Sequence, residues 1–299
     1  MANNIGWGQG AVNNNIGWGQ GASSNSISWG ISQKDSYSGE TEIYGIRGDV
    51  DALAFNSRVT SNGGALSTLE QTAINQLVVD LKAYGLWDSM KAIYPMVGAS
   101  AAACAQNLKS SSFTGTFTSG WTFASTGATP NGTNAYMDTG LIPSVDLTQN
   151  STHLSYYSRT NSLTGNVIDM GTSTGPTGTS FRTYILMRFG GVSYSSINSA
   201  SDNIVTTITD TRKFLLAYRN NSLNYTNQVN STQQTIASVS TGLSDKSIYI
   251  AAWNKNGTAD NFSLRETAFN SIGYGLTDTQ AANFYTAVQA FQTTLSRQV

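Results

Sequence analysis

The sequence is short of charge. Only 11% of its 299 residues are Asp, Glu, Lys or Arg, against about 25% in an average soluble protein. Sixteen basic and 17 acidic residues leave a formal net charge of −1, so no basic face of the kind that binds nucleic acid is expected. Ser, Thr, Asn, Gln and Gly take the place of the missing charges. Such a surface hydrogen-bonds water without strong fields, which suits a protein that sits beside many copies of itself.

Cysteine and histidine are almost absent. Cys104 is the single cysteine, which excludes an intrachain disulfide, and its small-residue surroundings ASAAACAQ indicate a packed thiol rather than a nucleophile. His153 is the single histidine. One His and one Cys do not make an ordinary zinc site, and calcium-loop, phosphate-loop and dinucleotide-binding motifs are missing. We expect no metal, no cofactor and a structural or surface role for His153.

Long apolar runs are also missing. No span approaches the about 20 apolar residues that cross a bilayer. The first residues, MANNIGWGQG, have neither the basic start nor the apolar stretch of a secretory signal. We therefore expect neither a membrane segment nor a secretory leader.

Carboxylates are too sparse for an obvious glycosidase. Glycoside hydrolysis usually needs two carboxylates that flank the scissile bond, yet Glu266 is the only glutamate from residue 96 onward. The aspartates, including Asp138, Asp146, Asp169 and Asp202, are scattered singly. The G-x-S-x-G motif of a serine hydrolase is absent as well. We expect no catalytic residues, and polysaccharide depolymerisation is kept as a weaker alternative.

Residues 1–33 contain an internal repeat. NIGWG occurs twice and SISWG follows, with isoleucine and tryptophan each recurring every 11 residues. The repeated residues are Ile5, Trp7, Ile16, Trp18, Ile27 and Trp29. Within each unit the two apolar residues are two apart, so on an extended chain they point to the same face. Because exposed indoles are costly, we interpret the repeat as an anchor that is covered by other polypeptides, with a flexible Gly-rich tail as the alternative.

Residues 34–95 are interpreted as a connector. Its first part is mixed, with short strand-like pieces and a loop at RVTSNGG. Ser67 and Glu70 then form an S-x-x-E capping box, which predicts a helix at about 67–84 that stops at Gly85. Ile74, Leu77, Val78 and Leu81 give this helix one apolar stripe, either for the core or for a contact between subunits. A second helix is predicted at about 86–93, before Pro95.

Residues 96–299 predict a mainly β domain, a jelly-roll sandwich that ends in a helix. About eight short runs rich in β-branched and aromatic residues, such as THLSYYSRT, FRTYILMRFG and KFLLAYRN, alternate with turn sequences. GTSTGPTGTS at 171–180 is predicted to be a surface loop. Thr277 and Gln280 cap the last helix, and Phe284, Val288, Phe291 and Leu295 line its apolar face.

Sugar binding requires aromatic platforms beside amide, hydroxyl or carboxylate groups. The β domain is rich in both, and its candidate residues are Trp121, Tyr136, Asp138, Trp253 and Asn254. Any one of them also fits a buried aromatic or a turn residue. The sequence does not rank them.

Several longer phrases resemble structural proteins of tailed bacteriophages that infect Bacteroidetes, including crAss-like phages. They are LSTLEQTAINQLVVDLKAYGLWDSMKAIYPMVG, NLKSSSFTGTF, GWTFASTGATPNGTNAYMDTGL, STHLSYYSRTN and LTDTQAANFYTAVQAFQTTLSRQV, and together they span about 66–299. The resemblance implies a concanavalin A-like (laminin G-like) sandwich in a fibre or appendage on the virion surface, made in the host cytoplasm. It carries no catalytic residues.

The hypothesis from the sequence is a non-enzymatic virion protein. Its N-terminus would dock to capsid, portal or tail, and its sandwich would be displayed for attachment to the host surface, usually as a homo-oligomer and most often a trimer. The alternative is a dedicated glycan receptor-binding protein. Many displayed copies would turn weak contacts into firm attachment.

Overall fold

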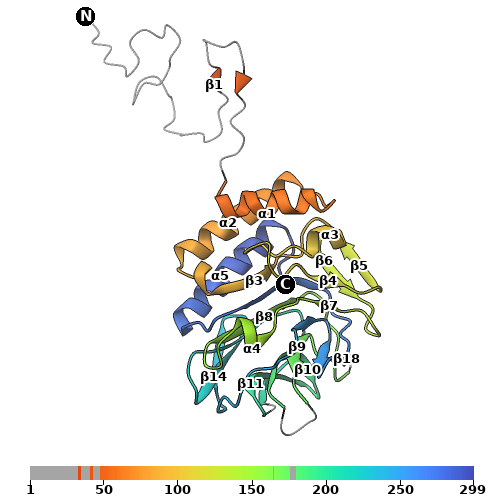
Figure 1. Ribbon diagram of the computed structural model, residues 1–299, viewed down its shortest axis with the longest axis vertical. Coiled ribbons are helices and arrows are strands. Elements are labelled where there is room, and N and C mark those ends of the chain that lie inside the picture. The colour runs from red at the N-terminus through yellow and green to blue at the C-terminus, as the bar shows by residue number, and fades with distance from the viewer. Residues whose placement is uncertain (1–32, 35–40, 43–47, 164, 176–179, 202) are drawn as a thin grey trace, which may run out of the picture. The chain divides into compact units, whose positions relative to one another are not determined.

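The computed structural model describes residues 33–34, 41–42, 48–163, 165–175, 180–201 and 203–299 (Figure 1). The chain divides into two units, Met1–Gly48 and Asp49–Val299. The described part of the first unit is one antiparallel pair, β1 (Gln33–Lys34) and β2 (Thr41–Glu42). The Ile and Trp residues of the predicted anchor all lie outside the described residues, so the anchor stays a prediction.

The second unit is a sandwich of two mainly antiparallel sheets. We call the first the covered sheet. In spatial order it contains β15 (Thr232–Ala237), β14 (Asn224–Val229), β13 (Phe214–Arg219), β8 (Thr152–Ser158), β19 (Thr267–Gly273), β6 (Gly127–Pro130) and β5 (Trp121–Ala124), and β3 (Met90–Tyr94) also pairs with β19. We call the second the open sheet. It contains β12 (Asn203–Thr207), β11 (Val192–Ser199), β10 (Arg182–Phe189), β9 (Met170–Ser173), β16 (Tyr249–Ile250), β7 (Met137–Asp138) and β4 (Thr116–Phe117), while β17 (Trp253–Lys255) pairs with β9 and with β18 (Thr258–Asp260). The predicted mainly β sandwich with a terminal helix is thus confirmed.

The covered sheet is so called because the long helices pack on it. The long ones are α1 (Val50–Ser61), α2 (Thr68–Ala83) and α5 (Asp278–Thr294), and the short ones are η1 (Trp87–Ser89), α3 (Ala101–Cys104) and α4 (Pro143–Asp146). Figure 1 shows α1, α2 and α5 on the side of the covered sheet that faces away from β9, β10 and β11. None of these three helices lies on the outer face of the open sheet.

Alternation along the strands of the covered sheet builds two cores. On β8 and β13, Tyr157 and Phe214 point to the helices, whereas Leu154, Tyr156 and Leu215 point to the open sheet. All five side chains are fully buried. A sheet with an apolar layer on each side reads as a continuous run of large residues, which is why KFLLAYRN contains few polar positions.

The helix predicted at 67–84 is confirmed. It runs over Thr68–Ala83, and the capping box between Ser67 and Glu70 is formed in both directions. Gly85 follows with a φ of 65°, a conformation that favours glycine at a helix end. The apolar stripe packs into the core shared with α5 and the covered sheet. Of the two predicted uses of this stripe, core packing is the one observed.

Two expectations for the connector are wrong. Residues 50–61 form α1, where strand-like pieces and a loop were expected, because Asp49 caps the helix and Ala52, Phe55 and Val59 recur at helical spacing. The helix predicted at 86–93 is instead η1 followed by β3. Residues of β3 are buried on both faces and pair with β19. An apolar run this short has no unique period, so tertiary pairing decided its state.

The connector is also not separate from the sandwich, since residues 49–299 form one compact unit. In the predicted loop 171–180, Gly171 to Ser173 belong to β9, while residues 176–179 lie outside the described part. The predicted terminal helix is confirmed as α5, with its capping box between Thr277 and Gln280. In the described part of the chain no helix has the length and apolarity to span a membrane.

Candidate functional site

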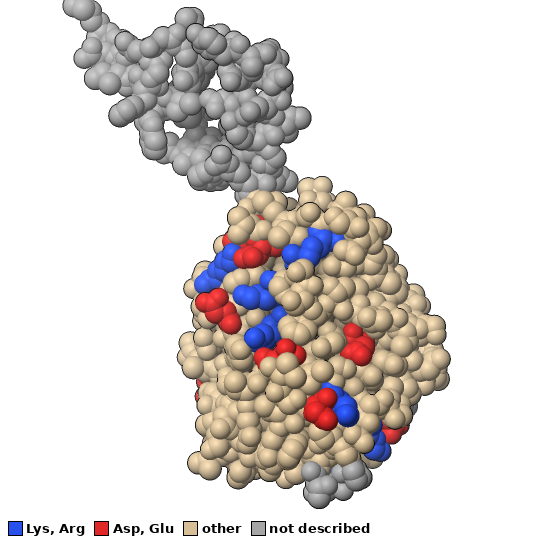
Figure 2. All heavy atoms as spheres, in the orientation of Figure 1, with Lys and Arg blue, Asp and Glu red and all other residues tan. Residues whose placement is uncertain are grey.

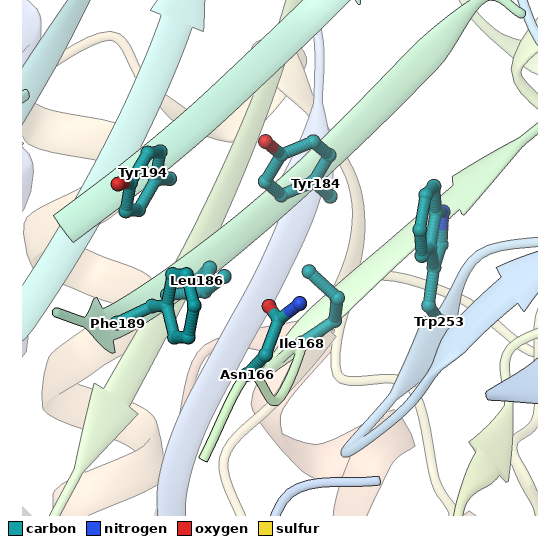
Figure 3. A pocket seen from close by; sticks show the side chains of 7 residues that line it. All are labelled: Asn166, Ile168, Tyr184, Leu186, Phe189, Tyr194 and Trp253. Atoms are coloured by element: carbon teal, nitrogen blue, oxygen red, sulfur yellow. The ribbon is translucent and has the colours of Figure 1, made fainter. Parts of the chain in front are cut away.

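The outer face of the open sheet carries an open pocket of about 190 Å³. Strands β10 and β11, the residues before β9, and β17 supply its walls (Figure 3). The described residues that line it are Asn166, Ile168, Tyr184, Leu186, Phe189, Tyr194 and Trp253. This volume is below the about 300 to 1,000 Å³ of sites that enclose a drug-sized ligand. The pocket therefore suits one ring or one end of a larger molecule.

Alternation along β10 points two large side chains outward. Ile185 and Met187 lie in the core between the sheets, whereas Tyr184 and Leu186 form a separate apolar cluster with Ile168. Tyr194 on β11 is the register partner of Leu186, and partners in register share a face. Ile168, Tyr184 and Leu186 are each 4% exposed, so this small cluster is buried although none of the described long helices covers it.

Gly171 on β9 lets two aromatic residues approach each other. Tyr184 and Trp253 are its register partners on β10 and β17, and their ring centroids are 6.0 Å apart. A Cβ atom at residue 171 would lie 2.3 Å from the Cβ of Tyr184, so a larger residue would move this ring. Figure 3 shows the Trp253 indole nearly edge-on at one end of the pocket, with one face turned toward the other lining residues.

The opposite end of the pocket is formed by the hairpin between β10 and β11. Gly190 and Gly191 have φ values of 59° and 91°, which two-residue hairpin turns of this kind require and which glycine adopts readily. Phe189 precedes them and is 44% exposed. Its ring centroid is 6.2 Å from that of Tyr194, so two rings close this end.

The described lining residues include no charged side chain. An ion pair lies beside the indole, where Lys255 Nζ is 5.5 Å from the Trp253 ring centroid and 3.4 Å from a carboxylate oxygen of Asp260, the register partner of Trp253. Exposed Asn166 supplies an amide at the pocket rim. The described lining thus combines aromatic rings, one amide at the rim and no charged side chain. Such a lining suits a ligand that is itself neutral and amphipathic.

A second aromatic group lies further along the same face. Tyr136 stacks on Tyr249 with ring centroids 4.3 Å apart, and Phe262 lies 6.4 Å from Tyr136. Tyr249 is the register partner of Gly171 on the side away from Tyr184, and its other partner is Asp138. Burial, together with the negative charge of Asp138, raises the pKa of Tyr249 to about 12. The tyrosine therefore stays neutral at ordinary pH.

The structure separates the five residues predicted for sugar binding. Trp253 lines the pocket, and Tyr136 and Asp138 belong to the second aromatic group. Trp121 lies elsewhere, on β5, where its ring packs against Phe117 and Phe123 and its indole N–H donates to the carbonyl of residue 136. Asn254 is 2% exposed, and its amide serves the turn, donating to the carbonyl of residue 247 and accepting from the N–H of Gly257.

Sequence reasoning missed most of the pocket, including Tyr184, Leu186, Phe189 and Tyr194. The signal was present in FRTYILMRFG, in which both alternating sets are large and apolar. Such a strand is either buried on both sides or carries an apolar outer face, and which of these applies depends on which sheet receives the helices. That assignment is a tertiary property.

The ionisable residues singled out in the sequence have structural partners. His153 is fully buried on the helix side of β8, where its Nδ1 is 2.6 Å from the carbonyl of Tyr274 and its Nε2 is 3.1 Å from Ser271 Oγ. Because a carbonyl only accepts, Nδ1 carries the proton and Nε2 accepts from the serine. Burial lowers the pKa of His153 to about 4. Cys104 is also buried, and desolvation raises the pKa of its thiol to about 12.

Among the described residues the carboxylates do not assemble into an acidic site, and Figure 2 shows acidic and basic side chains intermixed on the face in view. Asp169 is fully buried against Arg265, and Glu266 lies 3.5 Å from Arg159. Among the described residues, no three His, Cys, Asp or Glu side chains gather as metal ligands.

No protein-family model matches this chain, and no curated protein matches it either. Solved structures of similar fold do exist. A mutant of Trypanosoma rangeli sialidase that displays trans-sialidase activity has a TM-score of 0.51 at 7% identity, over 74% of this chain and 39% of the sialidase. Domain 4 of a GH43 extracellular arabinanase from Geobacillus stearothermophilus, in complex with arabinotriose, has a TM-score of 0.48 at 16% identity, over 66% of this chain and 98% of that domain.

A third similar structure is the CBM40 of a Ruminococcus gnavus sialidase bound to α2,3-sialyllactose. Its TM-score is 0.31 at 12% identity, over 43% of this chain and 77% of that module. At 7% identity the match to the sialidase shows the fold alone, a β-sandwich. The chain spans well under half of the sialidase enzyme it resembles.

Proposed function

We propose that the unit formed by residues 49–299 is a carbohydrate-binding module and that the pocket on the open sheet holds the sugar. The observation that carries this proposal is a pocket with aromatic walls and no charged side chain among its described lining residues, on the outer face of the open sheet, which none of the described long helices covers. A sugar ring presents C–H groups on its faces and hydroxyl groups around its rim. The partly exposed Trp253 indole at one end of the pocket and the exposed Phe189 ring at the other match the former. The amide of Asn166 matches the latter.

Binding without cleavage is the role that the chemistry of the pocket favours. Hydrolysis by the usual route needs two carboxylates about 5 to 9.5 Å apart across the glycosidic bond. The described lining residues include neither Asp nor Glu, and Glu266 is paired with Arg159. We therefore propose an adhesion module rather than a depolymerase. The appearance of new reducing ends on incubation with host capsule would contradict this.

A glycan array with the full chain tests sugar binding. Trp253→Ala removes one pocket wall and is expected to weaken binding about tenfold or more, since a loss of 1.4 kcal/mol corresponds to a factor of ten. Tyr84→Ala is the matched control, because Tyr84 is 39% exposed at the end of α2. Both variants should keep the melting temperature of the parent within a few degrees. Equal binding by the two variants would contradict the proposal.

The biological setting is proposed from the resemblance of residues 66–299 to phage structural proteins. We propose a virion appendage whose N-terminal repeat docks to capsid, portal or tail and whose sandwich contacts the host surface. Gold-labelled antibody against the sandwich should decorate intact virions. Antibody that labels only host membranes or cytoplasm would overturn this part and leave the sugar-binding proposal intact.

Display as a homo-oligomer, with a trimer favoured, follows from the same resemblance. Several copies on one stalk would raise weak single-site affinity into firm attachment. Analytical ultracentrifugation of the full chain gives the state directly. A monomer at micromolar concentration, together with unchanged binding to immobilised glycan, would argue against avidity.

A further inference from the structure

The pocket and the second aromatic group are linked into one strip. Ile168 lines the pocket and is bridged in parallel register to Phe262, so the two side chains share the outer face. Phe262 in turn lies 6.4 Å from Tyr136, which stacks on Tyr249. The aromatic surface thus continues from the Phe189–Tyr194 end, past Trp253, to Tyr136.

The strip is longer than one sugar ring. Tyr194 stands on β11 and Tyr249 on β16, which lie three strand positions apart in the open sheet. At about 4.8 Å per interstrand spacing, their backbones are about 14 Å apart. A ligand that contacts both ends therefore has several units.

The charge along the strip is small. The described pocket lining has none, the Lys255–Asp260 pair is internally compensated, and Asp138 beside Tyr249 adds one negative charge. Proteins recognise carboxylates mainly with arginine or lysine donors. The described lining residues offer neither, and Lys255, above the Trp253 ring, is already paired with Asp260. A sialylated or uronic-acid chain would meet an aromatic surface edged by an acidic group.

We infer that this face binds an extended neutral polysaccharide, with the Trp253 pocket as one subsite and the Tyr136–Tyr249 stack as another. The inference rests on the proposed sugar-binding function and adds the length and the charge class of the ligand. A neutral chain makes ring contacts at each subsite and is not repelled by the carboxylate of Asp138. Its affinity therefore increases with the number of sugar units until the strip is filled.

Affinity electrophoresis of the full chain provides the first test. Gels are cast with neutral polymers (arabinan, mannan and β-glucan) and with anionic ones (polysialic acid and polygalacturonic acid). At least one neutral polymer should retard the protein, and the anionic polymers should not. Stronger retardation by the anionic polymers would overturn the inference about charge. Retardation by none of the five would count against the proposed function itself.

Calorimetric titration with oligosaccharides of one to six units, prepared from the retarding polymer, provides the second test. We expect affinity to rise about tenfold or more between two and six units. Trp253→Ala should weaken every length, and Tyr136→Ala should weaken only the longer chains. Tyr136→Phe, which keeps the stacked ring, should bind like the parent. An unchanged melting temperature of Tyr136→Ala shows that its weaker binding does not come from misfolding.

The two proposals fail differently. If short and long oligosaccharides bind equally and Trp253→Ala still weakens both, the pocket binds sugar but the strip does not extend the site. If Trp253→Ala has no effect at any length, the pocket is not the sugar site. Binding of a protein partner or a second copy to this face would appear as complex formation that Trp253→Ala and Tyr136→Ala abolish while no polymer retards the chain.

Discussion

Arg265 and Asp169 form an ion pair that is completely shielded from water. Nη1 of the guanidinium lies 3.0 Å from both carboxylate oxygens, and both side chains are 0% exposed. Ser263 Oγ and the N–H of Met187 also donate to the carboxylate. The pair joins the entry of β9 to the loop before β19, directly behind the pocket strand β10.

Breaking this pair should destabilise the fold strongly. Asp169→Ala leaves a buried guanidinium without its counter-charge, and such losses cost about 3 to 5 kcal/mol. Glu266→Ala is the matched control, because 16% of its side chain is exposed to solvent and its distance to Arg159 is longer, at 3.5 Å. Its loss should therefore cost clearly less than that of the buried pair. Urea unfolding measures both. Similar decreases in the free energy of unfolding for the two variants would contradict the larger contribution expected of the buried pair.

His153 should make stability depend on pH in the mildly acidic range. Its pKa in the folded protein is about 4, lowered from 6.5 by burial, so the folded state favours the neutral ring. The unfolded state binds more protons between these two values, and folding stability therefore decreases as pH falls from about 6.5 to about 4. A shift of this size corresponds to about 3 kcal/mol.

The measurement is urea unfolding at a series of pH values for the parent and for His153→Gln. Titrating carboxylates act in both proteins, so the difference between the two curves isolates the histidine. That difference should shrink toward pH 4. Parallel curves would contradict a neutral, buried imidazole.

Packing of α5 should depend on Phe284. Its ring contacts those of Phe214, Phe269 and His153, with centroids 5.7, 6.0 and 6.1 Å away. Phe284→Ala should lower the free energy of unfolding by about 3 to 5 kcal/mol, because it leaves a cavity between helix and sheet. Leu69→Ala on α2 removes an apolar side chain that is 53% exposed and should change stability by less than about 0.5 kcal/mol. Thermal or urea unfolding of both variants measures these changes in stability. Equal changes for the two variants would contradict the role of Phe284 in packing α5.

Gly171 should matter for both stability and sugar binding. Gly171→Ala places a methyl group against Tyr184 and the carbonyl of residue 183, and overpacking of this kind costs about 1 to 3 kcal/mol. Because Tyr184 would have to move, glycan binding should weaken as well. On the same strand, Ser173→Ala removes a buried hydroxyl that has no hydrogen-bond partner among the described residues and should be neutral or slightly stabilising. Full glycan binding by a stable Gly171→Ala variant would contradict the role assigned to Tyr184.

The sequence determined the local elements by itself wherever short-range chemistry was complete. Ser67 with Glu70, and Thr277 with Gln280, are capping boxes that need only their own residues, and both helices begin there. Strands such as THLSYYSRT, FRTYILMRFG and KFLLAYRN were also predictable, because β-branched and aromatic runs between turn sequences favour strand pairing whatever the partner strand is. The mainly β sandwich followed from these elements.

Only the tertiary structure decided which faces were covered. The run MKAIY is a strand because β19 accepts it as a partner and both of its faces are buried, and no local signal specifies that partner. The pocket has the same origin. Tyr184 and Leu186 resemble core residues in the sequence and are buried in the structure. They nevertheless line a pocket on the outer face, beside the partly exposed Tyr194, because the long helices pack on the other sheet. Burial depends on residues that are distant in sequence. A pattern of apolar residues therefore shows which face of an element is apolar, but not what packs against that face.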